Sequence, residues 1–121
     1  MPAITLERPE RHTVLRSFAG HLESPPDEVF ARLVEHLTAE AARSGTESGL
    51  LVDEPTRAVI VQGEWWYRGE YAVLPEGHGD SVVEYEIVNV AQRAHRAAPF
   101  AGRREIASAP SVFQALLTAI G

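Results

Sequence analysis

The most distinctive chemistry in this sequence lies in a group of aromatic side chains near its middle. Residues 63–71 read Gly-Glu-Trp-Trp-Tyr-Arg-Gly-Glu-Tyr, so that Trp65, Trp66, Tyr67 and Tyr71 lie close together. Such rings can form the wall of a pocket for a planar or lipid-like ligand, which tyrosine hydroxyls can orient by hydrogen bonds. The same rings can instead be divided between the core and a contact with a neighbouring strand or protomer, and the sequence alone favours this second interpretation. Because successive strand residues point to opposite faces, one of the two tryptophans should be exposed.

Charged side chains form a second candidate group, on alternate positions of two expected strands. Arg68 and Glu70 share one parity of the first strand, and Glu84 and Glu86 share one parity of the next. A catalytic pair of carboxylates would need a pocket that separates their pKa values. Cross-strand charge pairing on a solvated face of the sheet fits the alternation better, so we expect a structural role for these residues.

A basic run and several scattered histidines complete the residues that could do chemistry. The run could bind a phosphate or carboxylate, or pair with acidic groups of the same chain or a second protomer; a solvated surface is the simpler expectation. It comprises Arg93, His95, Arg96, Arg103 and Arg104. The histidines are His12, His21, His36, His78 and His95. They lack the spacing of a metal site, and the chain has no cysteine, so the sequence predicts no metal, no cofactor and no thiol chemistry.

The composition indicates one soluble domain over residues 1–121, with residues 1–11 as a loose lead-in. Of the 121 residues, 45% are hydrophobic and 23% are charged. A net charge of −6 gives no reason to expect nucleic-acid binding. No apolar run approaches the ~20 residues that span a bilayer, and the charged N-terminus is unlike a secretory signal. We therefore expect a cytoplasmic protein without membrane contact.

The elements that must position these residues begin with a strand and a helix. Residues 12–22 predict a strand whose inward face the alternation leaves undecided. The following Ser-Pro-Pro-Asp-Glu sequence is typical of a helix start, with Ser24 as the expected N-cap. Apolar residues then recur at helical spacing, which predicts an amphipathic helix to about Arg43 that Gly45 ends.

From Gly49 the apolar period changes from 3.6 to 2, which predicts consecutive antiparallel strands over 49–53, 58–62, 65–74 and 81–91. Residues 93–104 are expected to be mostly irregular, and Pro110 to open a short C-terminal amphipathic helix. Strands in succession between helices indicate an α+β fold. We expect a curved antiparallel sheet of about five to six strands, packed through one face on the C-terminal helix, with one helix after the first strand.

This order of elements and two local motifs resemble the START-like, or SRPBCC, superfamily. Ser24–Phe30 is similar to the family's strand-to-helix junction, in which a small residue and proline precede an acidic residue, valine and an aromatic. Gly63–Tyr71 and Tyr85–Ala91 are similar to an actinobacterial-type branch. The likeness covers roughly residues 12–120 and implies a helix-grip fold around a small apolar ligand, as in polyketide cyclase/dehydrase-like and lipid-transfer-like members. Typical members have six or seven strands and a long C-terminal helix, and the family has no universal catalytic motif.

The resemblance and the strand parity together give the expected site. It is a cavity for a small apolar or aromatic ligand between the sheet and the C-terminal helix, and it contains no assigned catalytic residue. Its expected lining is Tyr67, Tyr71, Tyr85, Asn89, Phe113 and Trp65. Two alternatives stay open: a non-catalytic module whose outward tryptophan and basic run serve a homodimer or another partner, and a cyclase- or dehydratase-like enzyme with a tyrosine or glutamate as general acid or base.

Overall fold

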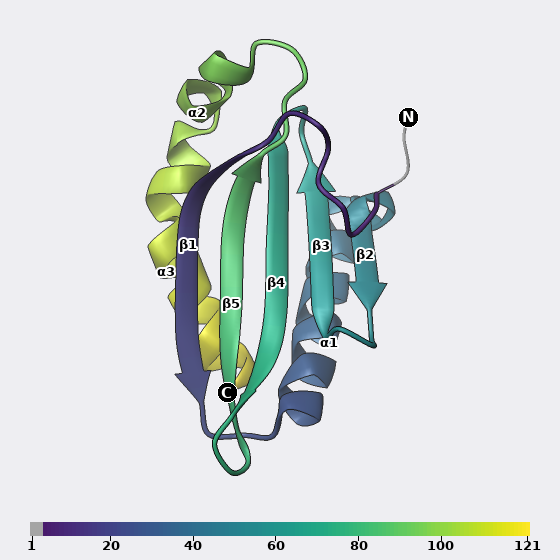
Figure 1. Ribbon diagram of the computed structural model, residues 1–121, viewed down its shortest axis with the longest axis vertical. Helices are drawn as coiled ribbons and strands as arrows, with labels where there is room; N and C mark the ends of the chain where they lie inside the picture. Colours follow the sequence, from purple (N-terminus) through teal and green to yellow (C-terminus); the bar gives the residue numbers. More distant parts are fainter. Residues whose placement is uncertain (1–3) are drawn as a thin grey trace.

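Five strands form one open antiparallel sheet in the order β1-β5-β4-β3-β2 (Figure 1). The computed structural model describes residues 4–121, apart from the side chain of Ser48, so residues 1–3 of the expected lead-in lie outside the description. The strands are β1 (Thr13–Leu22), β2 (Leu50–Asp53), β3 (Ala58–Gly63), β4 (Tyr67–Glu76) and β5 (Asp80–Asn89). The helices are α1 (Pro26–Ser44), α2 (Ala98–Ala101) and α3 (Arg103–Ile120), with 3₁₀ turns η1 (Glu47–Gly49) and η2 (His95–Ala97). The expected α+β fold, with a helix after the first strand and another at the C-terminus, is confirmed.

The start of α1 differs by one detail from the sequence prediction. The N-cap is Pro25, which makes no side-chain capping bond, and the helix begins with Pro26. A proline is tolerated there because the first N–H groups of a helix have no partner within it. Ser24 is therefore not the cap, and its carbonyl instead accepts a 2.6 Å hydrogen bond from the Ser81 hydroxyl. The helix ends as expected at Gly45, whose φ of 69° is left-handed.

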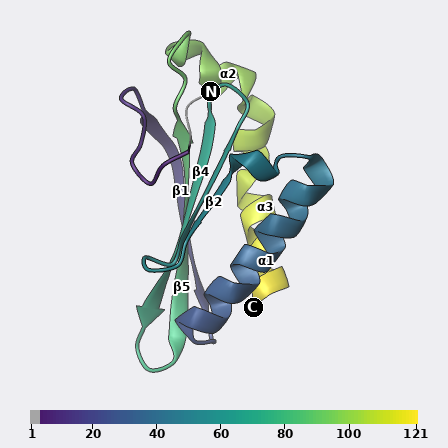
Figure 2. The same ribbon diagram turned by 90° about the vertical axis from the view of Figure 1, so that its right-hand side faces the viewer.

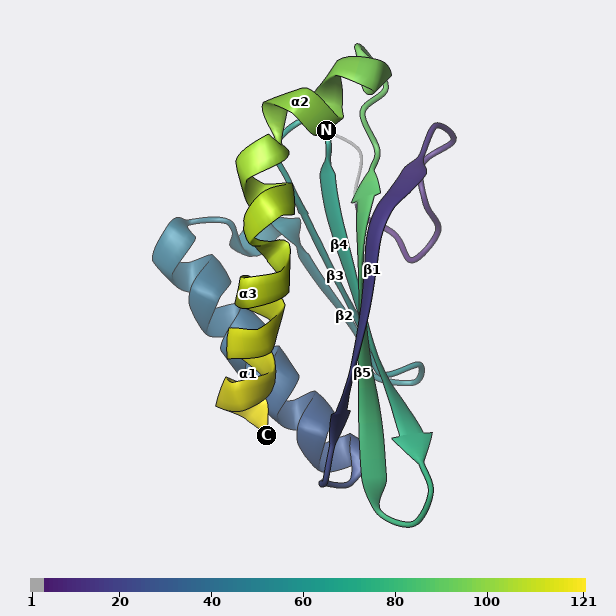
Figure 3. The ribbon, with the colours of Figure 1, turned by 90° about the vertical axis from the view of Figure 1, so that its left-hand side faces the viewer.

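Both long helices cover the same face of the sheet (Figures 2 and 3). Odd-numbered residues in the middle of β3, β4 and β5 point toward the helices and are mostly apolar or aromatic, so the period of 2 in the sequence becomes one buried face. Ser81 and Asn89, at the two ends of β5, are buried polar residues with the same parity. The centre of this core comprises Val29, Leu33, Leu37, Val59, Tyr71, Val73, Val83, Tyr85, Ile87, Phe113, Leu116 and Ile120. Among residues 4–121, no helix is long and apolar enough to span a bilayer.

The C-terminal helix is longer than predicted, because it does not begin at Pro110. It starts at Arg103 and carries Pro110 in its interior. Pro110 is exposed, whereas Ile106, Ala109 and Phe113 are buried, so the pyrrolidine ring is on the solvent side and the buried stripe runs past it. Proline removes one backbone hydrogen bond from a helix, but packing of the stripe against the sheet outweighs this loss. The preceding basic segment is likewise more regular than expected, since it contains η2, α2 and the first turn of α3.

The face of the sheet opposite the helices is partly covered, which corrects the expectation of a fully solvated face. Residues 4–11 of the lead-in cross this face, as the two side views show (Figures 2 and 3). Arg8 is within 2.7 Å of Glu70 and 3.1 Å of Glu86, and Arg68 is only 1% exposed. The Arg68 guanidinium donates to the Leu6 carbonyl and to Glu70. Arg8, Arg68, Glu70 and Glu86 therefore form a pairing network, which agrees with the structural role expected for the charged residues of this face.

Candidate functional site

The three tyrosines of the chain come together on the helix-covered face of the sheet. Tyr71 on β4 and Tyr85 on β5 are directly opposite in the register, and their rings stack with centroids 4.4 Å apart. Tyr67 on β4 shares a hydrogen bond with Tyr85, with 2.6 Å between the two hydroxyl oxygens. The two strands thus place two phenol hydroxyls side by side against α3.

The meeting of these hydroxyls depends on a glycine between the β4 tyrosines. Gly69 lies between Tyr67 and Tyr71 on the same face of the strand, and a Cβ there would overlap the Tyr67 hydroxyl. The same Cβ would come within 3.2 Å of Tyr85 Cε1. Because this position has no side chain, the Tyr67 ring can lie back along the strand toward Tyr85.

Two phenylalanines extend the aromatic cluster toward β1 and α3. The Phe113 ring lies 5.8 Å from Tyr85 and 5.6 Å from Phe18, between ring centroids. Phe18 in turn stacks on Tyr85 at 5.8 Å. Tyr85 is therefore held on several sides by aromatic contacts of favourable geometry, which fixes the position of its hydroxyl.

A cavity of about 280 Å³ lies beside the hydroxyl pair, between the sheet and α3. Its wall is formed by Gly63, Glu64, Tyr67, Tyr85, Ile87, Glu105, Ser108, Ala109 and Val112. The members from the sheet interior, Tyr85 and Ile87, are buried, whereas Glu64, Glu105 and Val112 are exposed. The cavity is therefore an opening that is apolar and aromatic inside and carries carboxylates at its mouth.

Burial controls the acidity of the tyrosines. Loss of hydration raises the pKa of Tyr67 and Tyr71 well above 10.0, and the neighbouring Tyr85 phenol raises both further. Burial also raises the pKa of Tyr85, although hydrogen bonds from the other two tyrosines oppose this rise. All three hydroxyls are consequently protonated at neutral pH. They can donate and accept hydrogen bonds, but they do not supply a phenolate base.

The structure brings together only part of the predicted site. Tyr67 and Tyr85 line the cavity, while Tyr71 and Phe113 support it by stacking on Tyr85. Asn89 lies apart: its buried amide donates to the His95 carbonyl and accepts from the Ala91 N–H, so it holds the loop after β5. Trp65 is also outside the cavity wall, and is 49% exposed in the β3–β4 turn.

The other tryptophan, Trp66, has a structural role. It is buried, and its indole lies against Gly102 in the connection between α2 and α3, where no side chain could fit. The prediction that one of the two tryptophans would be exposed is confirmed. The pair belongs to a turn, however, and not to the strand that the sequence predicted.

The helix side of the cavity was missed by reasoning from the sequence. It consists of Glu105, Ser108, Ala109 and Val112, which all belong to the region around Pro110. A signal was present, because Ile106, Ala109 and Phe113 continue one helical stripe across the proline. Reading Pro110 as a helix start concealed that continuity.

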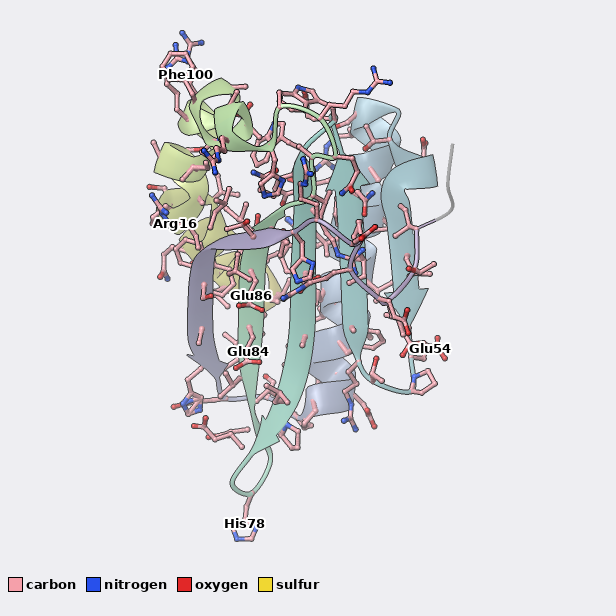
Figure 4. All side chains as sticks on the ribbon, turned by 45° about the horizontal axis from the view of Figure 1, so that its top comes forward. Arg16, Glu54, His78, Glu84, Glu86 and Phe100 are labelled. Carbon is pink, nitrogen blue, oxygen red and sulfur yellow. The ribbon has the colours of Figure 1, made fainter. Side chains whose placement is uncertain are left out.

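The remaining charged groups are placed elsewhere in the fold. Arg93, Arg96, Arg103 and Arg104 are exposed, and Arg103 packs over the exposed Phe100 ring at 4.5 Å. Glu84 and Glu86 point away from the helices (Figure 4). Among residues 4–121, no three potential metal-ligating side chains converge.

The fold and cavity define an α+β protein with an open antiparallel sheet and a small aromatic-walled opening beneath its last helix. No protein-family model matches this chain, and no curated protein matches it.

Proposed function

We propose that this protein binds a small aromatic ligand in the cavity between β4, β5 and α3, in the manner of the START-like superfamily that its sequence resembles. The observation that carries the proposal is the Tyr67–Tyr85 hydroxyl pair, whose two residues line an opening with an apolar and aromatic interior. Within the pair one hydroxyl donates to the other, so one proton and several lone pairs are left for a ligand. A phenol or a similar ring with one polar atom matches this arrangement.

The size of the cavity limits the ligand. Its volume of about 280 Å³ is just below the ~300–1,000 Å³ of pockets for drug-sized molecules. An apolar cavity of about 150 Å³ is enough to bind benzene. The ligand is therefore expected to be one ring with a short substituent, which is a narrower class than the lipids bound by some members of the superfamily.

The state of the tyrosines favours binding over proton abstraction. A cyclase or dehydratase with a tyrosine base would need a phenol that ionises near neutral pH. Burial here raises the pKa of Tyr67 and Tyr85, so that the protonated form dominates. The hydroxyls accordingly serve to hold and orient a ligand.

Titration with 4-ethylphenol, followed by amide NMR, tests the proposal. Saturable shifts are expected for Ile87, Ala109 and Val112 in the cavity wall. The double variant Tyr67→Phe, Tyr85→Phe keeps both rings and should weaken 4-ethylphenol about tenfold, the value of one hydrogen bond, without weakening ethylbenzene. Tyr71→Phe removes a hydroxyl that supports Tyr85 but is not part of the cavity wall, so it should weaken 4-ethylphenol less than the double variant does. Absence of saturable shifts at these amides would sink the proposal.

Native mass spectrometry of the purified protein addresses the identity of the ligand. A co-purified small molecule should appear as extra mass that is lost under denaturing conditions. A molecule that contains no ring would contradict the proposed ligand class.

A further inference from the structure

Two carboxylates at the mouth of the cavity are not used by the proposed binding of a phenol ring. Glu64 belongs to the β3–β4 turn and Glu105 to the first turn of α3, so two separate elements bring them to one opening. Neither forms a salt bridge with a basic side chain within residues 4–121. No arginine or histidine is part of the cavity wall. The ionisable groups at the mouth that could be charged at neutral pH are therefore carboxylates alone, among the residues of the cavity wall.

The backbone at Glu64 is held in an unusual conformation. Its φ of 58° is left-handed, a region that glycine and asparagine adopt far more readily than glutamate. The preceding Gly63 has open space around its Cα and adds no constraint of its own. Glu64 lines the cavity in this conformation, at a position where glycine would have formed the turn more easily.

We propose that the ligand of this cavity carries a protonated amine on a short arm beside its aromatic ring, with Glu64 and Glu105 binding the amine. The inference rests on the proposed function and narrows its ligand class. The ring of the ligand packs against Tyr67 and Tyr85 inside the cavity. The ammonium group stays at the mouth, where it contacts the carboxylates and keeps water on its outer side. Aromatic faces also attract cations, so the wall and the carboxylates favour the same charge.

Three ligands with the same phenol ring but different net charge test whether charge, and not shape, determines the affinity. They are tyramine, which is a cation, 4-ethylphenol, which is neutral, and 4-hydroxyphenylacetate, which is an anion. Affinities measured by amide NMR titration at low ionic strength should decrease in that order. Added salt should weaken tyramine and leave 4-ethylphenol unchanged, because only the former depends on screened charge.

Single charge-removing variants assign the effect to these two residues. Glu64→Gln and Glu105→Gln should each weaken tyramine by roughly two- to fivefold, which is the range of a solvent-exposed ion pair, and leave 4-ethylphenol unchanged. Glu54→Gln is the matched control, since it alters net charge equally but lies in the β2–β3 turn, at the opposite end of β3 from Gly63 (Figure 4). If Glu64→Gln does not fold, Glu64→Asn removes the charge with a residue that accepts positive φ.

The possible outcomes distinguish this inference from the function on which it rests. Equal affinity for tyramine and 4-ethylphenol, or an equal loss in Glu54→Gln, overturns the amine assignment and leaves the aromatic site in place. Failure of all three ligands to bind overturns both. The expected order, with loss confined to the two mouth variants, supports both.

Discussion

At the scale of single residues, the cavity wall depends on the absence of a side chain at Gly69. A methyl group there would overlap the Tyr67 hydroxyl and press on Tyr85, so the ring of Tyr67 would have to move. Gly69→Ala should lower the free energy of unfolding by about 1–3 kcal/mol, the usual cost of overpacking a core. Urea denaturation measures this loss, and the weakened binding of 4-ethylphenol should accompany it.

Gly63 provides the matched control for this substitution. Gly63 itself lines the cavity, but a Cβ there would meet no atom within 4 Å. Gly63→Ala should therefore leave the free energy of unfolding within about 0.5 kcal/mol of the natural value. Equal losses for the two variants would show that backbone freedom, and not the Tyr67 contact, explains the glycine at position 69.

The tyrosines also predict a response to alkaline pH. The chain has 3 tyrosines, all in this cluster, so tyrosinate absorbance reports on the site alone. The folded state raises the pKa of each phenol above 10.0, so the cluster contributes stability below that pH and loses it as pH rises through the folded-state values. We expect tyrosinate to appear only above pH 10.0, together with the loss of native circular dichroism. Half-ionised phenols at pH 10.0 in a folded protein would contradict the burial of the cluster.

At the scale of elements, residues 4–11 form a strap across the face of the sheet opposite the helices, through contacts of Leu6 and Arg8. Glu70 and Glu86 are paired directly across β4 and β5, and Arg8 neutralises the resulting repulsion by contacts of 2.7 Å and 3.1 Å. Arg8→Ala should lower the free energy of unfolding by about 1–2 kcal/mol, because it removes a bidentate charged contact that is partly buried. Arg43→Ala, which breaks an exposed pair with Glu40, should cost only about 0.5 kcal/mol.

The contact of Arg8 with Glu70 also predicts how the free energy of unfolding changes at acid pH. Burial alone would raise the pKa of Glu70, but hydrogen bonds from Arg8 and Arg68 outweigh it and hold the pKa below 4.5. The ionised carboxylate therefore contributes stability above its ordinary pKa and loses it as pH falls through the lower, folded-state value. Urea denaturation can be measured at neutral pH and at about pH 3. Between these two pH values, the free energy of unfolding should decrease less for Arg8→Ala than for the natural protein. A loss of the same size would mean that Arg8 does not hold Glu70 ionised.

Local patterns predicted most elements of this fold and only part of its long-range arrangement. The helical period of α1 and the alternation of β3, β4 and β5 depend on neighbouring residues, so the sequence displays them directly. The contact of Arg8 with Glu70 joins positions 62 residues apart, and no local period reports it. In the site, parity correctly placed Tyr67 and Tyr85 on the helix-covered face. Asn89 has the same parity, but it lies at the end of β5, where loop hydrogen bonds use its amide.

Pro110 lies inside α3, although the sequence predicted that it would begin the helix, and its substitution tests how the helix tolerates it. Pro110 lacks the N–H that would bond to the Ile106 carbonyl, and the helix continues only because its buried stripe packs on the sheet. A proline inside a helix costs about 3 kcal/mol relative to alanine, of which reduced freedom of the unfolded chain recovers about 1. Pro110→Ala should therefore raise the free energy of unfolding by about 1–2 kcal/mol. A less stable variant would show that the proline shapes α3 to fit the sheet and the cavity.

At the scale of the whole molecule, the surface favours a monomer over the homodimer that the exposed tryptophan suggested. Among residues 4–121, the large exposed apolar side chains belong to six different segments of the sequence: Leu6, Val14, Trp65, Leu74, Phe100 and Val112. The edge strand β1 has an irregular register between Val14 and Arg16, and the other edge, β2, has only 4 residues, so neither edge is a long regular template for a second sheet.

Net charge also favours a monomer, because a charge of −6 on each copy opposes self-association. We expect size-exclusion chromatography with light scattering to give 13.3 kDa at every protein concentration tested. A mass twice as large would place the interaction module ahead of ligand binding. The variants Trp65→Ser and Phe100→Ser would then identify the contact, because Phe100 is 72% exposed and projects away from the body of the protein (Figure 4). Dissociation by Trp65→Ser would be the more consequential result, since the adjacent Glu64 lines the cavity and a partner at that turn would cover its mouth.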